Sequence, residues 1–255
     1  MATELLNQGF SPSGALWRLL EVDAVRRVWT DTPLERPVLE LGCGDGTFTR
    51  LALGHVETAI DIEPSAVERA RQADGVYGRV LCQDARSLTE AQDYGTVLAN
   101  CVLEHIAGVE DVLAGCMRAL KPGGHLVATV PLVAMNDHLL VHSARYAEGR
   151  RRQLIHHNLW SSDDWVAKLR VAGFQKTVVI PYLSGELCSL WDSLDAPTWL
   201  GVGRYRVGKF LRYKAQLPKP ARQRLDAYVG RLLVNAARKR RENGPPCATL
   251  LLATK

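Results

Sequence analysis

The stretch "VLELGCGDGTFT" at residues 38–49 constrains the fold of this chain most, because an apolar run leads directly into three glycines at alternate positions. Glycine has no side chain, so its backbone can adopt positive φ and can approach a ligand closely. A strand, a glycine-rich turn and a helix in this order are typical of nucleotide sites in parallel sheets. The dinucleotide fingerprint G-x-G-x-x-G does not fit, because Gly46 follows Gly42 by four residues and Thr47 occupies the expected glycine position.

Apolar runs alternate with amphipathic stretches along the rest of the chain, which predicts an α/β fold with helices on both faces of a mostly parallel sheet. Pro64 and Ser65 open one expected helix with residue types that helix starts favour, and "KPGG" at 121–124 ends another. The expected strands are residues 37–42, 58–62, 78–85, 95–100, 125–132, 175–183 and 248–255, and the expected helices are residues 46–54, 64–73, 108–120 and 161–174.

Two longer segments, residues 133–160 and 184–246, interrupt this alternation, and both follow expected strands at the edge where ligands bind. We therefore expect three parts in the chain. These are an N-terminal helical segment at 1–36, a core formed by 37–183 plus 247–255, and a helical lid or insertion at 184–246. The insertion contains apolar residues at helical spacing, which predicts an amphipathic helix. We expect it to pack on the body of the protein, and the alternative is that it binds lipid. These apolar residues are Leu225, Tyr228, Val229, Leu232, Leu233 and Ala236.

Charge is distributed unevenly along the chain. Residues 201–255 contain 14 Lys and Arg against two acids, so they carry +12, whereas the first 200 residues carry −7. This pattern fits either a solvated basic face or a partner with phosphates, including a membrane surface. The sequence has no run of 18 apolar residues and no secretory signal, and its six cysteines form no C-x-x-C pair. We expect a cytoplasmic protein with reduced thiols and no transmembrane segment.

Three acids lie where a nucleoside would need them. Asp61 ends the second expected strand, and a carboxylate there can accept hydrogen bonds from both ribose hydroxyls. Asp84 follows the third expected strand and is placed for the adenine amine, while Glu40 could orient a cationic amino group or tune the glycine loop. The local alternatives are a helix cap for Asp61 and a turn residue for Asp84. Together the acids predict a nucleoside with a cationic tail rather than a pyrophosphate.

Five stretches resemble the class I S-adenosylmethionine-dependent methyltransferases in that family's order and spacing, over about residues 37–132. They are "VLELGCGDGTFT", "AIDIEPSAVERAR", "CQDA", "YGTVLANCVLEHI" and "ALKPGGHLVATVP". The resemblance implies a Rossmann-like, seven-stranded mixed sheet in the order 3-2-1-4-5-7-6, with an antiparallel last strand and a helical insertion before it. It also implies S-adenosyl-L-methionine as the cofactor and S-adenosyl-L-homocysteine as the product.

The resemblance assigns the sulfur-bearing end of the cofactor to the glycine loop and to the end of the fourth strand. Gly42, Cys43 and Gly44 would line its methionine part, and Glu40 precedes these glycines. Asn100 and Val102 would flank the sulfonium. These residues form one half of the expected cofactor site.

The resemblance assigns the adenosine end of the cofactor to residues at the ends of the second and third strands. Asp61 would hold the ribose, Ile62 would cover the adenine face, and Asp84 with Ala85 would contact the adenine edge. His105, in "LEHI", is expected to border the same pocket. Both halves depend on residues that immediately follow strands.

Methyl transfer is an in-line displacement, so the protein mainly supplies alignment, and a hydroxyl acceptor benefits from a general base such as histidine. We expect His157 or His156 to be this base, because their segment should return over the site. Some relatives bind a divalent metal through E-x-x-E-H at the end of the fourth strand. Cys101 replaces the first acid here, so we expect no metal.

The acceptor is interpreted as a small molecule, most simply an oxygen of a secondary metabolite or saccharide. The alternative is a phosphate-rich or lipid-linked acceptor, such as RNA or a polyprenyl-linked glycan, bound by the basic C-terminal region. "NCVL" stands where adenine methyltransferases carry [DN]-P-P-[YF], so nucleic acid is not the expected partner, while peripheral membrane contact stays open. A third hypothesis is a non-catalytic binding module.

Overall fold

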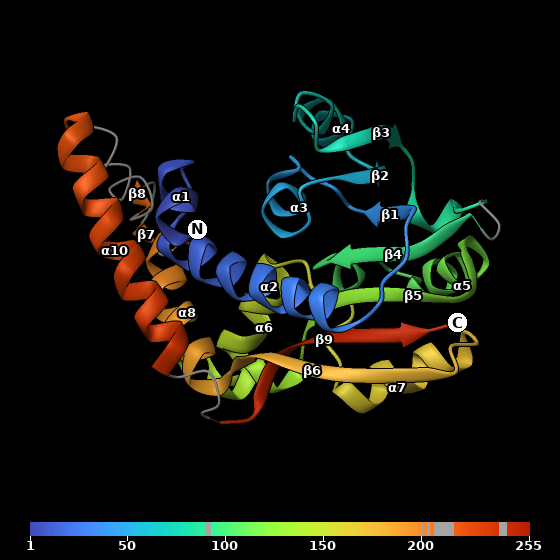
Figure 1. Cartoon of the computed structure of the whole chain (residues 1–255). Coiled ribbons are helices and arrows are strands. Elements are labelled where there is room, and N and C mark those ends of the chain that lie inside the picture. Colours follow the sequence, from blue (N-terminus) through green and yellow to red (C-terminus); the bar gives the residue numbers. More distant parts are fainter. Residues whose placement is uncertain (90–92, 200, 203–204, 207–216, 240–243) are drawn as a thin grey trace. The chain divides into compact units, whose positions relative to one another are not determined.

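A seven-stranded sheet forms the centre of the computed structural model, which describes residues 1–89, 93–199, 201–202, 205–206, 217–239 and 244–255. Its strand order is β3-β2-β1-β4-β5-β9-β6, with β9 between β5 and β6 (Figure 1). Neighbouring strands from β3 to β5 pair in parallel, whereas β9 runs antiparallel to β5. The strands are β1 Val38–Leu41, β2 Val56–Asp61, β3 Tyr77–Cys82, β4 Tyr94–Asn100, β5 Leu120–Pro131, β6 Lys176–Ser184 and β9 Pro246–Thr254. The predicted fold class and order are confirmed.

The described helices begin where the sequence carries start signals. Pro64 occupies the first turn of its helix, and Ser161 with Asp164 forms a capping box at the start of α7. The helices are α1 Ala2–Asn7, α2 Pro12–Asp31, α3 Thr47–Ala52, α4 Pro64–Arg71, α5 Val109–Ala119, α6 Ala144–Gln153, α7 Ser162–Val171, α8 Gly185–Trp199 and α10 Lys219–Lys239. A two-stranded hairpin, β7 Gly201–Val202 and β8 Tyr205–Arg206, follows α8.

The fifth strand starts earlier than the sequence predicts. Helix α5 ends at Ala119, just before the predicted stop signal at residues 121–124. These four residues are themselves part of β5, which begins at Leu120. The pairing register of β5 with β4 shifts between Tyr94 and Thr96, so the glycines lie at an irregularity of the ladder. Glycine permits such a shift because it accepts backbone conformations that other residues avoid.

Alternate residues of the strands point to two separate apolar clusters. Ile60 packs in the larger cluster with α5 and α7, while the preceding Ala59 packs with α4 on the other side. Trp165 of α7 is fully buried in the larger cluster. This alternation is the period of two that a strand imposes, and it explains why the central strands read as continuous apolar runs.

The chain forms two compact units. The sheet unit contains Glu21–Val133, Glu148–Tyr182 and Ala248–Lys255, and the helical unit contains Met1–Leu20, Ala134–Ala147 and Leu183–Cys247. None of the described helices is both long enough and apolar enough to cross a bilayer. The division into 1–36, the core and 184–246 stays a prediction.

Helix α10, in the helical unit, packs differently from the sequence prediction. The residues that it buries are Asp226, Gly230, Leu233 and Ala237. Gly230 allows close contact with α1, because a Cβ at this position would lie 2.3 Å from Oγ1 of Thr3. Three residues predicted for the packed face, Leu225, Tyr228 and Leu232, are instead exposed. The apolar spacing located the helix correctly but assigned the wrong face, because small residues rather than large ones face α1.

Candidate cofactor site

A pocket of about 460 Å³ opens in the sheet unit, where β1, β2, β3 and β4 end. It brings together residues that lie far apart in the sequence, as expected at the carboxyl edge of a parallel sheet. Its lining is Gly42, Ile60, Asp61, Ile62, Gln83, Asp84, Ala85, Arg86, Cys101, Val102, His105, Ile106, Ala107 and His157. Eight of the residues predicted from the sequence belong to this lining, namely Gly42, Asp61, Ile62, Asp84, Ala85, Val102, His105 and His157.

The glycine loop after β1 is tied to the end of β2. The backbone N–H groups of Gly42 and Cys43 donate to the Ile60 carbonyl at 2.8 and 3.2 Å, and the N–H of Gly44 donates to Oδ2 of Asp61 at 2.9 Å. Gly42 has φ +66°, and a Cβ there would lie 2.4 Å from Cγ2 of Val102. A Cβ on Gly44 would meet nothing within 4 Å. The loop is therefore packed on one side and open on the other.

The two predicted acids of the pocket both make local contacts. Oδ1 of Asp61 accepts from the N–H of Glu63 at 2.9 Å, so each of its oxygens already accepts one backbone hydrogen bond. Asp84 accepts from the backbone N–H of Arg86 and pairs with its guanidinium, with Nη2 2.6 Å from Oδ2. These hydrogen bonds hold the pKa of Asp84 below its usual value. Asp61 retains lone pairs for a ligand, since each of its oxygens can accept more than one hydrogen bond, whereas each oxygen of Asp84 already accepts two from Arg86.

Glu40, at the end of β1, and Cys43, in the loop, lie behind the loop backbone. Like Gly44 and Asn100, they are not part of the pocket lining. Glu40 is buried, and its Oε2 accepts from the hydroxyl of Thr49 at 2.5 Å. Cys43 packs in the smaller apolar cluster, and burial, reinforced by the carboxylate of Glu40, raises the pKa of its thiol to about 12. A thiol in this environment stays protonated and behaves as a small apolar side chain.

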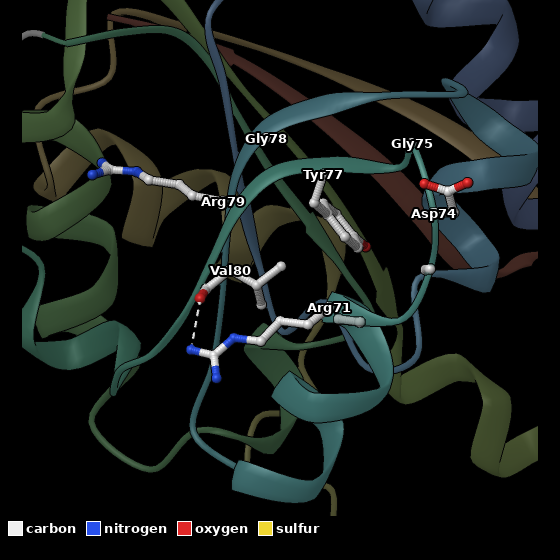
Figure 2. Close-up of a pocket in the computed structure, with 9 residues that line it drawn as sticks. Arg71, Asp74, Gly75, Tyr77, Gly78, Arg79 and Val80 are labelled. Carbon is white, nitrogen blue, oxygen red and sulfur yellow. Dashed lines mark hydrogen bonds between the residues drawn. The ribbon is translucent and has the colours of Figure 1, made fainter.

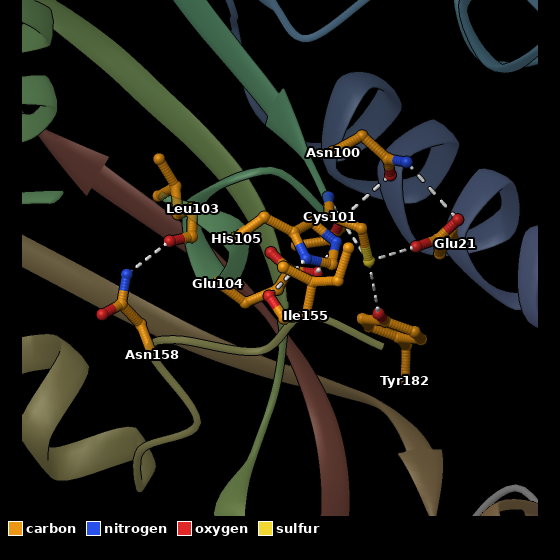
Figure 3. A network of polar contacts seen from close by, with 10 residues as sticks. Glu21, Asn100, Cys101, Leu103, Glu104, His105, Ile155, Asn158 and Tyr182 are labelled. Carbon is orange, nitrogen blue, oxygen red and sulfur yellow. Dashed lines mark hydrogen bonds and ion pairs between the residues drawn. The ribbon is translucent and has the colours of Figure 1, made fainter. Parts of the chain in front are cut away.

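A buried polar network lies at the end of β4 (Figure 3). Sγ of Cys101 donates to Oε1 of Glu21 at 2.7 Å, and the amide of Asn100 lies 3.4 Å from Oε2 of the same carboxylate. Cys101 has φ +48°, a left-handed conformation that is unusual for a residue with a side chain. The hydroxyl of Tyr182 lies 4.0 Å from the thiol, and burial together with the charges nearby raises the pKa of this phenol. Helix α2 and strand β6 thus both contribute to the end of β4.

The three histidines near the pocket differ in environment. His157 is exposed and lines the pocket, and its backbone N–H donates to the Glu104 carbonyl at 2.8 Å. His105 also lines the pocket, with Nδ1 3.1 Å from the Ile155 carbonyl, and burial lowers its pKa. His156 is buried outside the lining, 5.4 Å from the ring of His105, and burial and neighbouring positive charge lower its pKa to about 4.

Glu104, His105 and His156 each bring one potential ligand atom within 4.8 Å of the others. Nε2 of His105 lies 3.7 Å from Oε1 of Glu104. Cys101, which takes the place of the first acid in the E-x-x-E-H signature, directs its thiol to Glu21. The structure therefore gathers three candidate ligands, one of which, His156, the sequence did not connect with the other two.

A second hollow lies between α4 and the start of β3, away from the strand ends (Figure 2). Its arginines are engaged in the fold, because Arg71 donates to the Val80 carbonyl at 3.1 Å and Arg79 donates to the hydroxyls of Thr58 and Tyr94. The hollow has none of the glycine and acid arrangement described above. The pocket at the strand ends is therefore the candidate cofactor site.

Sequence reasoning missed Arg86, Glu21 and Tyr182. The pairing of Arg86 with Asp84 could have been predicted, because a cation two residues after a predicted ligand-binding acid would pair with it. Glu21 and Tyr182 reach Cys101 from 80 and 81 positions away along the chain. No local pattern in the sequence connects residues at such separations.

The sheet order and the strand-end pocket are similar to those of the class I S-adenosylmethionine-dependent methyltransferases, whose fold this chain has. Residues 39–128 match the family model described as a methyltransferase domain. S-Adenosylmethionine is the cofactor of this family, and a pocket lined by Gly42, the exposed apolar Ile62 and two acids fits a nucleoside of this kind. The remaining matches describe particular relatives.

Among curated proteins, the ubiquinone biosynthesis O-methyltransferase of Thiobacillus denitrificans is 30% identical over 135 residues, which cover 48% of this chain and 57% of that protein. The trans-aconitate 2-methyltransferase of Streptomyces coelicolor is 33% identical over 111 residues, covering 40% of this chain and 37% of that protein. The match thus spans about half or less of these relatives' length.

Solved structures extend the similarity of fold over nearly the whole chain. A methyltransferase from Thermotoga maritima has a TM-score of 0.57 at 17% identity, covering 94% of this chain and 92% of that one. Phosphoethanolamine N-methyltransferase 2 of Haemonchus contortus, solved with S-adenosyl-L-methionine, has a TM-score of 0.59 at 13% identity, covering 100% of this chain and 60% of that one. At these identities the comparison establishes the fold.

Proposed function

We propose that this chain transfers a methyl group from S-adenosylmethionine to an oxygen of a small organic acceptor. The observation that carries the proposal is the single pocket in which the glycine loop, Asp61, Asp84 and the end of β4 meet. The curated relatives named above, an O-methyltransferase and a trans-aconitate methyltransferase, support a small acceptor. All six cysteines are free, which supports action in the cytoplasm.

The adenosine end of the cofactor would be held by the residues after β2 and β3. Each oxygen of Asp61 has capacity for a second hydrogen bond, so the carboxylate can bind two ribose hydroxyls while it holds the N–H groups of Gly44 and Glu63. Ile62 is 63% exposed beside the pocket and offers an apolar surface to adenine. Asp84 with Ala85 would contact the edge of the base.

The methionine end would lie along Gly42, Cys43 and Gly44, whose backbone is open at Gly44. Val102 and Asn100 would flank the sulfonium. Asn100 is held in place from behind, because its Oδ1 accepts from Thr129. Glu40 would act indirectly, since its buried bond to Thr49 supports the loop.

The bound cofactor supplies an electrophilic methyl group, so the chain has to align the acceptor and remove its proton. We assign His157 as the general base because it is exposed at the pocket. His156, buried and outside the lining, would position the segment that carries His157. Its low pKa keeps it neutral near pH 7, where it cannot act as a cationic partner.

The test combines binding and turnover on the purified chain. Labelled S-adenosylmethionine is offered with a panel of phenols, carboxylic acids, saccharides and amines, and calorimetry measures cofactor binding separately. We expect methylation of an oxygen acceptor, and we expect His157→Ala to lower kcat by about a hundredfold or more while cofactor affinity is kept. If His157→Ala turns over normally at every pH, the base is another group.

The panel also separates the alternatives. A phosphate-rich or lipid-linked acceptor held by the basic residues of 201–255 would lose affinity steeply as salt rises, whereas a neutral acceptor in the pocket would respond little. A chain that binds no S-adenosylmethionine in the calorimeter would be a binding module rather than an enzyme.

A further inference from the structure

Helix α10 presents three distinct faces, and only one of them packs within the helical unit. The buried face contains Asp226, Gly230, Leu233 and Ala237, spaced so that they lie on one side of the helix. Asp226 is the only acid of α10, and it is 2% exposed. The solvent-facing surface of this helix therefore carries no carboxylate.

The second face is an apolar stripe formed by Leu225, Tyr228 and Leu232, which are 41%, 55% and 50% exposed. Their spacing of three and four residues places them above one another on successive turns. Single exposed apolar residues are common on protein surfaces, but a row of large ones on one helix face marks an interaction surface. The scattered exposure of single apolar residues that is normal for a protein surface therefore does not account for this stripe.

The third face is an arginine row formed by Arg224, Arg231 and Arg238, all of them exposed. They are seven residues apart, close to two helical turns, so they lie in a line along the helix. Each of the first two immediately precedes a residue of the apolar stripe, which puts the arginine row beside the stripe. Lys219 and Lys239 add exposed positive charge at the two ends of the helix.

We propose that this exposed side of α10 docks on an anionic lipid surface. An apolar stripe with basic residues along its edge is the pattern of helices that lie in the plane of a membrane interface. The stripe would enter the boundary between headgroups and acyl chains, and the long arginine side chains would extend to the lipid phosphates. Tyr228 suits this depth because its ring is apolar and its hydroxyl is polar.

The stripe decides between a lipid surface and a nucleic acid. An RNA backbone would satisfy the arginine row but would leave Leu225, Tyr228 and Leu232 in water. A membrane interface would bury the apolar stripe and would also bind the arginine row through its lipid phosphates. The proposal concerns the helical unit and goes beyond methyl transfer, so it does not depend on which acceptor the pocket takes.

The test is flotation of the full chain with vesicles of phosphatidylcholine alone or mixed with phosphatidylglycerol. We expect binding to the mixed vesicles, little binding to the neutral ones, and weaker binding as salt rises. Replacing the arginine row by glutamine (Arg224→Gln, Arg231→Gln and Arg238→Gln) should weaken binding roughly tenfold or more. Replacing the stripe by serine (Leu225→Ser, Tyr228→Ser and Leu232→Ser) should weaken it comparably without any change of net charge.

A control of equal charge loss is Arg27→Gln, Arg69→Gln and Arg152→Gln, three exposed arginines outside α10. This variant should bind like the unaltered chain, and urea unfolding should verify that all variants fold. Absence of binding to anionic vesicles would overturn the proposal. Equal weakening by the control variant would also overturn it, because binding would then depend on net charge alone. A third contrary result is a stripe variant that binds vesicles normally while RNA competes for the arginine row.

Discussion

Sγ of Cys101 lies 2.7 Å from the carboxylate of Glu21, although 80 positions separate the two residues in the chain. Glu21 is fully buried on α2, and the same carboxylate lies 3.4 Å from the amide of Asn100. The contact joins α2 to the end of β4, where Cys101 holds a left-handed backbone conformation at the pocket. The end of β4 at the pocket thus contacts a helix that lies outside the five stretches resembling the methyltransferases.

Glu21→Ala should lower the free energy of unfolding by about 2 kcal/mol, because it leaves a thiol and an amide without their charged acceptor. Urea unfolding followed by circular dichroism measures this change. The exposed Glu68→Ala on α4 is the control, with an expected change below about 0.5 kcal/mol. Equal effects of the two substitutions would mean that the buried network contributes nothing.

Asp61→Ala should weaken S-adenosylmethionine binding by about 1.5–3 kcal/mol, roughly tenfold to a hundredfold, because charge-assisted bonds to the ribose are lost. Calorimetry gives the dissociation constant directly. Asp74→Ala is a matched control, since Asp74 is an exposed acid that lines the second hollow. If Asp74→Ala weakens binding and Asp61→Ala does not, the cofactor binds at that hollow.

Gly42→Ala should weaken both folding and cofactor binding. The new Cβ would lie 2.4 Å from Cγ2 of Val102, and the residue would keep φ at +66°. Positive φ alone costs about 1–3 kcal/mol in a non-glycine residue, and the steric clash adds to it. The double variant Gly42→Ala with Val102→Ala relieves the clash and should recover part of the unfolding free energy. No recovery would show that backbone conformation alone limits this position.

Stability should fall in mild acid because of His156. Its pKa is about 4 in the folded protein against 6.5 as the ordinary value, so the unfolded chain binds a proton first as the pH drops. The contribution is fully present above about pH 6.5 and is lost progressively toward pH 4, by about 2 kcal/mol at pH 5. Urea midpoints measured between about pH 7 and 5, with chelator present, test this.

His156→Gln should flatten this part of the pH dependence, because glutamine does not titrate. The exposed neighbour Ile155→Gln, which removes no titratable group, serves as the control and should leave the slope unchanged. A slope that survives in His156→Gln would assign the acid sensitivity to other groups.

We expect methyl transfer without a metal. The first acid of the E-x-x-E-H signature is replaced by Cys101, whose thiol is directed to Glu21, so among the residues that the structure describes only Glu104, His105 and His156 come together. Turnover should be the same with and without EDTA, and elemental analysis of the purified chain should find far less than one divalent ion per molecule. Loss of activity in EDTA that Mn²⁺ or Zn²⁺ restores would contradict this prediction.

The sequence predicted the sheet well because each strand carries its own signal. The run at 95–100 and the capping residues near Ser161 specify local structure that depends little on distant contacts. The pocket was predictable at Gly42, Asp61 and Asp84 for the same reason, since each lies at or just after the end of a strand.

Contacts between residues far apart in the chain explain the features that the sequence did not predict. The thiol of Cys101 finds Glu21 only once α2 packs at the end of β4. The packed face of α10 was misjudged because Gly230 rather than a large apolar residue faces α1. Spacing along a helix identifies an amphipathic segment, but which side becomes buried depends on the neighbour.

The position of β9 between β5 and β6 has a consequence for synthesis on the ribosome. β6 is complete at Ser184, yet the neighbour that joins it to the rest of the sheet is made only when the chain reaches Pro246. Until then its backbone amides have no strand beside them, and the nascent sheet stops at β5. The final assembly of this sheet therefore waits until residues 246–254 have been made, however early the glycine loop forms.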